Sequence, residues 1–299
     1  MQFGIILLIG TVPCCTVYLF AILATLEMQP PPSPTATLPP NPTSQSPTTP
    51  TVPRSDAPID TERQAIAPPS KPAAPPLPAI VKLQGVTKTY VNGSHALAGV
   101  DLLVRQKDFL FITGPSGSGK STLLKLLYGA ERPSRGNVIV DDCNVGQLRG
   151  DRLSLLRRRI GIVFQDYKLI PRRTIAENVA FVLRAQGFAR KEIQRRLAPT
   201  LKIVGLQNKA DCFPEQLSGG EQQRASIARA IVSTPPLILA DEPTGNLDAD
   251  NALQVMKIFQ KLNTFGATIL VTTHDERLVR LCNHPVIQLN KGKLQRARG

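Results

Sequence analysis

The sequence predicts an α/β fold in which strands carry polar side chains at their carboxyl ends. Three short apolar runs support this prediction: residues 108–113 (DFLFIT), 237–240 (LILA) and 267–272 (ATILVT). Each run is followed by glycine, acidic or histidine residues. In open α/β sheets the ligand-handling residues lie at the carboxyl ends of the strands. We therefore expect the residues that follow these runs to share one ligand site.

The first run leads into GPSGSGKS, which matches the phosphate-loop pattern G-x-x-x-x-G-K-[ST] in full. Glycines allow consecutive backbone N–H groups to surround an anion, and the predicted helix 120–128 points its positive end at the same place. An ordinary Gly/Ser loop is the alternative, but the complete motif between a strand and a helix disfavours it. We expect Lys120 to reach the β- and γ-phosphates of ATP and Ser121 to bind Mg²⁺. The residues expected to bind ATP here are Gly114, Pro115, Ser116, Gly117, Ser118, Gly119, Lys120, Ser121 and Thr122.

An acidic pair, Asp241 and Glu242, follows the second run. At a strand end beside a phosphate loop, Asp241 is placed to hold Mg²⁺. Glu242 is placed to accept a proton from the attacking water, which is the role of a general base. A simple turn or helix cap is the alternative, and the phosphate loop in the same chain favours the catalytic interpretation.

Two further polar residues follow predicted strands. His274 comes just after the third run, so we expect it to contact the γ-phosphate, although a lone histidine is more often structural. Gln165 follows the run 160–164 and is a candidate to hold Mg²⁺ or the attacking water. His95 and His284 have no comparable position, and no role is expected for them.

A second helix start lies about a hundred residues after the phosphate loop, in LSGGEQQRASIARA, residues 217–230. Ser218 is a suitable N-cap, and Gly219 and Gly220 leave the first backbone N–H groups uncovered. Such a helix start binds anions, yet this one has no lysine of its own. It therefore suits an anion that is already held elsewhere.

The first 79 residues differ in composition from the rest. Residues 3–26 contain no charge, and a 24-residue helix of about 36 Å would cross a bilayer core of about 30 Å. A transmembrane anchor and a chain that starts near Met28 are the open interpretations for residues 1–28. A cleaved signal peptide is disfavoured, because no Lys or Arg precedes Arg54 and export would remove the domain from ATP.

Residues 29–79 hold 17 of the 27 prolines and few large apolar residues, so a disordered, partly polyproline linker is expected there. Residues 1–79 carry three basic and four acidic side chains, so residues 80–299 have a formal charge of +15. This charge fits nucleic acid, anionic lipid headgroups, an acidic partner or a solvated surface. The five cysteines form no C-x-x-C pair, so neither a metal site nor a disulfide framework is expected.

Taken together, these motifs resemble the ATP-binding subunits of ABC ATPases. GPSGSGKS resembles the family's Walker A loop, LILADE its Walker B strand and LSGGEQQR its signature motif. Gln165, the segment 245–248 and His274 match the Q-loop, D-loop and H-loop, and Tyr90 in VTKTYVNG matches the aromatic residue that stacks on adenine. The resemblance covers residues 80–293 and implies a P-loop NTPase domain over 80–299. That domain would have a parallel or mixed sheet core and a helical subdomain at about 166–222.

The resemblance also explains the second helix start. In this family the signature motif binds the γ-phosphate of ATP held by a second subunit, so Ser218, Gly219, Gly220 and Asp248 would complete the partner's site. The chain is therefore expected to form a homodimer that encloses ATP and Mg²⁺ at its interface. Chromosome-organising members carry a long heptad insertion and translation-associated members a second cassette, and this chain has neither. A nucleic-acid partner is therefore disfavoured.

A finer resemblance is to the FtsE/LolD/MacB subgroup, which shares ADEPTGNLD, residues 240–248. Within it, FQDYKLIPRRTIAENVAF, residues 164–181, is most similar to the FtsE branch. This implies an integral membrane partner of FtsX type, control of peptidoglycan hydrolases in cell division, and a place at the cytoplasmic face of the membrane. Arginines near this stretch could also meet anionic lipid headgroups. A LolD- or MacB-type lipoprotein or drug exporter is the alternative, since it would share every catalytic residue.

Overall fold

The structure is a computed structural model that describes residues 76–296. The predicted hydrophobic segment 1–28, and the predicted linker up to residue 75, lie outside the described residues. Within the described range, no helix is both long and apolar enough to cross a membrane.

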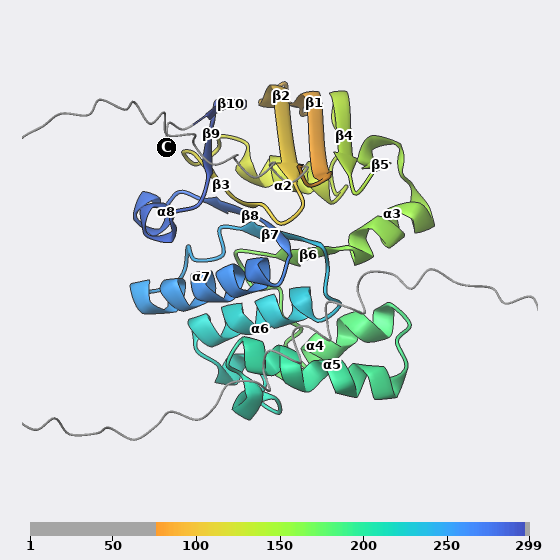
Figure 1. The fold of residues 1–299 in the computed structure, drawn as a ribbon, viewed down its shortest axis with the longest axis vertical. Coiled ribbons are helices and arrows are strands. Elements are labelled where there is room, and N and C mark those ends of the chain that lie inside the picture. Colours follow the sequence, from red (N-terminus) through yellow and green to blue (C-terminus); the bar gives the residue numbers. More distant parts are fainter. Residues whose placement is uncertain (1–75, 297–299) are drawn as a thin grey trace, which may run out of the picture. The chain divides into compact units, whose positions relative to one another are not determined.

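A six-stranded sheet forms the centre of the described part (Figure 1). In spatial order its strands are β10 (Lys293–Arg296), β9 (Val286–Asn290), β3 (Phe109–Thr113), β8 (Thr268–Thr273), β7 (Leu237–Asp241) and β6 (Ile160–Val163). Strand β10 is antiparallel to β9, and the other neighbours are parallel. Every residue of β8 is buried, which is typical of a parallel strand covered on both faces. Because β3, β8 and β7 are adjacent, their carboxyl ends lie side by side.

A second sheet is antiparallel and has four strands. In spatial order these are β2 (His95–Arg105), β1 (Ala79–Thr89), β4 (Arg135–Val140) and β5 (Cys143–Asn144). Helix α2 (Lys120–Leu127) packs between the two sheets, as Figure 1 shows. Its buried leucines share one apolar cluster with Val81 and Val138 of the antiparallel sheet and with Leu239 and Leu270 of the six-stranded sheet. The phosphate loop that precedes α2 is therefore fixed from both sides.

Three helices form a group on the other side of the six-stranded sheet, below it in Figure 1. They are α4 (Ile175–Ala185), α5 (Arg190–Ile203) and α6 (Gly219–Ile231). Thr174 begins α4 with a capping box completed by Glu177. The apolar faces of the three helices share a cluster with β6, β7, β8 and helix α7 (Ala249–Thr264), so the group is packed onto the core.

The remaining elements are short. They are the helices α3 (Gly150–Arg158) and α8 (Glu276–Cys282) and the 3₁₀ turns η1 (Val145–Gln147), η2 (Gln207–Lys209) and η3 (Pro214–Gln216). Helix α8 ends at Asn283, which has a φ of 47° and so terminates the helix in the left-handed conformation.

Candidate active site

The phosphate loop is held by close backbone contacts that exclude side chains at two glycines. A Cβ atom at Gly114 would lie 2.1 Å from the carbonyl oxygen of Leu289, and one at Gly119 would lie 2.3 Å from that of Ala96. Both glycines have positive φ, 151° and 107°. Between them, Pro115, Ser116 and Gly117 form the turn, and Ser118 is buried. The loop is thus pressed against the backbones of β9 and β2.

Lys120, the first residue of α2, is buried and lies across this loop. Its Nζ donates to the carbonyl oxygens of Gly114 (2.8 Å) and Pro115 (3.1 Å). The same atom lies 3.4 Å from Oε1 of Glu242, at the end of β7. The ammonium group therefore links the phosphate loop to the predicted general base.

The start of α2 carries no cap from a side chain. Its N-cap is Gly119, and within the described residues no side chain accepts from the first backbone N–H groups. Its first turn holds no acidic residue either. These N–H groups and the helix dipole are therefore open to an anion.

Ser121 and Asp241 meet at the ends of α2 and β7. Oγ of Ser121 donates to Oδ1 of Asp241 over 3.1 Å. The same carboxylate oxygen accepts from Oγ1 of Thr272 on β8, at 2.7 Å. A hydroxyl and a carboxylate thus converge beside the phosphate loop, and oxygen ligands of this kind suit Mg²⁺.

Glu242 has a strained backbone and two side-chain partners. Its φ is 45°, and its N–H donates to both the carbonyl oxygen and Oγ1 of Thr272, each over 3.1 Å. Oε2 of Glu242 lies 3.0 Å from Nδ1 of His274, while Oε1 faces Lys120. Left-handed non-glycine residues persist where their surroundings fix them, often in active sites. The strain aims the carboxylate between Lys120 and His274.

Gln165 lies near Glu242, whereas Tyr90 lies near the start of α2. A Cβ atom at Gly245 would lie 3.6 Å from Nε2 of Gln165 and 3.7 Å from Oε2 of Glu242, so all three are neighbours. The hydroxyl of Tyr90 is hydrogen-bonded to Oγ1 of Thr122 over 3.2 Å. The Tyr90 ring also lies 4.9 Å from Nζ of Lys88.

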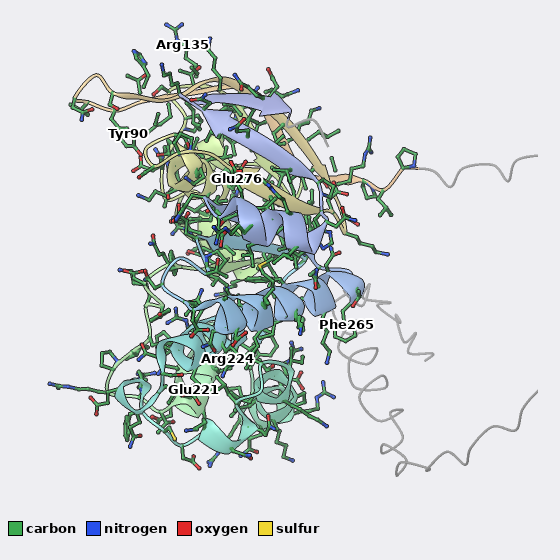
Figure 2. The ribbon with its side chains drawn as sticks, turned by 90° about the vertical axis from the view of Figure 1, so that its left-hand side faces the viewer. Tyr90, Arg135, Glu221, Arg224, Phe265 and Glu276 are labelled. Atoms are coloured by element: carbon green, nitrogen blue, oxygen red, sulfur yellow. The ribbon has the colours of Figure 1, made fainter. Side chains whose placement is uncertain are left out.

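The second helix start lies apart from this cluster within one chain. Figure 2 shows Glu221, in the first turn of α6, well separated from Tyr90. Ser218 caps α6 in a reciprocal box: Oγ of Ser218 accepts from the N–H of Glu221 (3.3 Å), and the Glu221 carboxylate accepts from the N–H of Ser218 (2.9 Å). The bond from the Ser218 backbone lowers the pKa of Glu221. Ser218 and Gly219 are exposed, whereas Gly220 is buried.

Asp248 caps α7 rather than pointing into the cluster around Glu242. Its Oδ1 accepts from the N–H of Asn251 over 2.8 Å, and its Oδ2 accepts from Nδ2 of the same residue over 2.7 Å. The backbone bond from Asn251 lowers the pKa of Asp248, which keeps its carboxylate ionised. Like Ser218, Asp248 thus stands at a helix start.

Sequence reasoning missed several residues that hold the site together. Thr272 contacts Asp241 and Glu242, and its position at the end of an apolar strand was the available signal. Arg229 donates to the carbonyl oxygens of Tyr167 and Lys168, just after Gln165. No local pattern indicates that contact, because the residues are about sixty positions apart.

Comparisons with known proteins agree with this geometry. The family described as ABC transporter matches residues 97–245. The chain belongs to the ABC transporter family and is an ABC-type ATPase. It is similar to the cell division ATP-binding protein FtsE of Streptococcus pneumoniae, with 44% identity over 73% of this chain and 95% of that protein. FtsE of Bacillus subtilis is 41% identical over 73% and 95%, and FtsE of Escherichia coli is 43% identical over 72% and 97%.

Solved structures give the same fold. The dimeric ATP-binding cassette MJ0796, bound to ADP and Pi, has a TM-score of 0.67 and 40% identity over 73% of this chain and 99% of that one. CbiO1 from Clostridium perfringens has a TM-score of 0.68 and 30% identity over 73% and 87%. These similarities confirm the predicted α/β ABC ATPase fold with a mixed sheet.

Proposed function

We propose that the chain is the ATP-hydrolysing subunit of an FtsEX-like membrane complex that controls peptidoglycan hydrolases during cell division. The observation that carries the enzymatic part is the convergence of Lys120, at the start of α2, with Glu242 and His274, which follow the adjacent strands β7 and β8. The similarity to three FtsE proteins over nearly their whole length supports the cellular role.

In this proposal one ATP binds along α2 and its loop. The backbone N–H groups of 114–122, except at Pro115, which has none, and the ammonium of Lys120 hold the phosphates. The Tyr90 ring stacks on adenine. Lys120 currently donates to carbonyl oxygens of its own loop, and phosphate oxygens would replace them as stronger, charge-assisted partners. The loop therefore needs little rearrangement to accept the nucleotide.

The oxygen ligands at the strand ends fit Mg²⁺. Ser121 and Asp241 already lie within 3.1 Å of each other, and Gln165 approaches from β6 beside Gly245. We assign these three residues to the ion. When bound, Mg²⁺ neutralises charge that builds up on the phosphate oxygens. Thr272 fixes the orientation of the Asp241 carboxylate.

Glu242 is the proposed general base. Its carboxylate takes a proton from the attacking water, while Lys120 and His274 hold that carboxylate from two sides. The second ring nitrogen of His274 is proposed to face the γ-phosphate, to which it donates when the imidazole carries both protons. Gln165 orients the water.

The helix start at Ser218 is the reason why we propose a homodimer. Ser218, Gly219, Gly220 and Asp248 would face the ATP bound to the other copy, because a helix start without its own lysine suits a phosphate that is held elsewhere. The similar cassette MJ0796 is a dimer. As a test, Glu242→Gln should give an ATP-bound dimer that hydrolyses slowly. Normal turnover by a monomeric variant would contradict both roles.

A cavity of about 390 Å³ between β6 and α4 is the proposed docking site for the membrane partner. Its lining includes Ile162, Phe164 and the half-exposed Phe181. Arg157 also lines it and donates to the carbonyl oxygens of Tyr128 (3.0 Å) and Gly129 (2.9 Å), at the end of α2. Movement of a docked partner would therefore reach the helix that begins at the phosphate loop.

Two arginines near this cavity have a second proposed role. Arg173 lies over the Phe181 ring at 4.6 Å, and the neighbouring Arg172 is exposed. We propose that these arginines meet acidic loops of the partner or anionic lipid headgroups, which would place residues 80–299 at the cytoplasmic face of the membrane. Residues 166–222 would form the helical subdomain that moves with the partner. Residues 1–28 and 29–79 would supply an anchor and a linker.

The cellular role is tested by purifying the native protein from detergent-solubilised membranes and identifying its partner by mass spectrometry. A membrane protein of FtsX type, together with cell-wall hydrolases or their activators, is the expected result. A lipoprotein- or drug-exporting permease would instead assign the chain to transport. Replacing Arg172 and Arg173 by Glu should uncouple the partner from ATP hydrolysis.

A further inference from the structure

The two glycines at the start of α6 each face a side chain from a different element. A Cβ atom at Gly219 would lie 3.2 Å from the hydroxyl oxygen of Tyr167, which follows Gln165. A Cβ atom at Gly220 would lie 2.2 Å from Oδ1 of Asn251, which follows Asp248. The start of α6 is therefore enclosed between the loop after β6 and the start of α7.

Tyr167 is held in place by α6 itself. Arg229, near the end of that helix, donates from Nη2 to the carbonyl oxygen of Tyr167 over 2.9 Å and from Nη1 to that of Lys168. Both residues have left-handed φ, 57° and 52°, which non-glycine residues rarely adopt. One guanidinium thus fixes two strained carbonyl groups, and the Tyr167 side chain reaches from there to the first turn of α6.

Asn251 links α6 to Asp248 at the start of α7. Its Nδ2 donates to Asp248, and its Oδ1 accepts from Nη1 of Arg224 on α6 over 3.1 Å. Arg224 also donates to Oε1 of Gln254 over 3.0 Å. Because Asn251 touches Asp248, Arg224 and Gly220 together, a shift of Asp248 cannot leave α6 unaffected.

The middle of α6 offers no competing polar anchor. Gln223 and Ser226 are fully buried there, and their side chains have no hydrogen-bond partner among the described residues. Polar contacts from α6 to neighbouring elements come instead from Arg224 and Arg229, and from Glu221, whose Oε1 lies 3.7 Å from Nζ of Lys209. The contacts of Gly219 with Tyr167 and of Gly220 with Asn251 therefore contribute directly to the position of the helix start.

We infer that Tyr167 and Asn251 are positioning residues for the anion-binding start of α6. Tyr167 transmits the position of the loop that carries Gln165, and Asn251 transmits the position of Asp248. The inference rests on the proposed function, in which this helix start binds the ATP of a second copy. Among the described residues no hydrogen bond joins either side chain to the phosphate loop of its own chain, so both act on assembly of the composite site rather than on nucleotide capture.

The test uses the full chain carrying Glu242→Gln and measures ATP-dependent association by analytical ultracentrifugation. Tyr167→Ala and Asn251→Ala should each weaken association about tenfold or more, because small displacements of a binding group are costly. Binding of a fluorescent ATP analogue to the monomer should stay within about twofold of the parent, since contacts of the phosphate loop are untouched.

Two matched variants serve as controls. Tyr167→Phe keeps the ring against α6 and should associate like the parent. Gln254→Ala removes a hydrogen bond from the same Arg224 but no contact with Gly220, and it should also associate normally. Hydrogen exchange adds a local measurement: Tyr167→Ala should speed exchange in the first turn of α6 and leave α2 unchanged.

A suppressor experiment separates positioning from general stability. Gly220→Ala should abolish association, because its Cβ would meet Oδ1 and Cγ of Asn251 at 2.2 and 2.4 Å. Adding Asn251→Ala removes both atoms and should restore part of the association. Parent-like association of Tyr167→Ala and Asn251→Ala, or no recovery in the double variant, would overturn the inference. A Glu242→Gln parent that stays monomeric with ATP would overturn the composite site itself, and this inference with it.

Discussion

Helices α2 and α6 both begin with glycines at a proposed anion-binding position, yet their first turns differ. Helix α2 starts after Gly119, in a left-handed conformation, without a side-chain cap in the described structure and with a buried lysine. Helix α6 starts after Ser218 with a complete capping box and Glu221 in its first turn. The first helix leaves its N–H groups open, whereas the second satisfies part of them with its own side chains.

Under the proposed function, this difference separates nucleotide binding, at the start of α2, from dimer assembly, at the start of α6. An uncapped start with a lysine binds an anion strongly but is less well satisfied without one. A capped start is stable alone, and its ionised Glu221 repels anions that arrive unaccompanied. The proposed order of events, nucleotide binding first and dimer formation second, follows from these two local designs.

Lys120→Ala should have the largest effect on this comparison. Loss of the ammonium should lower hydrolysis by about a hundredfold or more and weaken ATP binding by the monomer, because a charged group no longer meets the phosphates. Steady-state hydrolysis and titration with a fluorescent ATP analogue measure this. Lys125→Ala, in the last turn of the same helix, is the control. If Ser218→Ala weakened ATP binding by the monomer as much as Lys120→Ala, the two helix starts would not have different roles.

Adding a methyl group should affect the two helix starts unequally. Gly119→Ala places Cβ 2.3 Å from the carbonyl oxygen of Ala96 at a φ of 107°. We expect a loss of about 2–4 kcal/mol in the free energy of unfolding from strain and overlap. Gly219→Ala lies in a regular helix and should change stability by less than about 1 kcal/mol. Urea denaturation measures the free energy of unfolding of both variants. Similar losses in Gly119→Ala and Gly219→Ala would contradict the prediction.

Removal of the cap should have a smaller effect. Ser218→Ala should cost about 1 kcal/mol in the free energy of unfolding, and Thr174→Ala should cost the same, since both residues form capping boxes. In the Glu242→Gln chain, however, loss of Ser218 should weaken ATP-dependent association while loss of Thr174 should not. Thermal unfolding and ultracentrifugation together test this. A matching defect in both variants would mean that cap stability alone controls association.

The smallest expected effect concerns pH. The hydrogen bond from the Ser218 backbone lowers the pKa of Glu221, so its charged form stabilises the fold above the ordinary value of 4.5. That stabilisation is lost as the pH falls through the lowered pKa. When the pH is lowered, the free energy of unfolding of the parent should therefore fall by about 0.5 kcal/mol more than that of Glu221→Gln. Identical pH profiles for parent and variant would show that Glu221 does not contribute.

Much of the nucleotide-binding edge was predictable because its signals are local. The strand predicted at 108–113 is β3, the helix predicted at 120–128 is α2, and the acidic pair at 241–242 lies at the end of β7. The antiparallel sheet was not predicted, since β1 pairs with β4 about fifty residues away. The contacts of Tyr167 and Asn251 with α6 were missed for the same reason. No local pattern specifies which loops meet across a fold.

The capping box at Ser218 and Glu221 also bears on competition between anions. Glu221 is an intramolecular competitor for the N–H group of Ser218 at the start of α6. Dissolved phosphate must displace it by bulk concentration alone. In the proposed dimer, the γ-phosphate is tethered to a docked surface, where effective concentrations are on the order of millimolar or higher. Under the proposed function the carboxylate would thus set a threshold that tethered phosphate passes and free phosphate does not. The helix start would then respond to ATP on a partner rather than to the phosphate content of its surroundings.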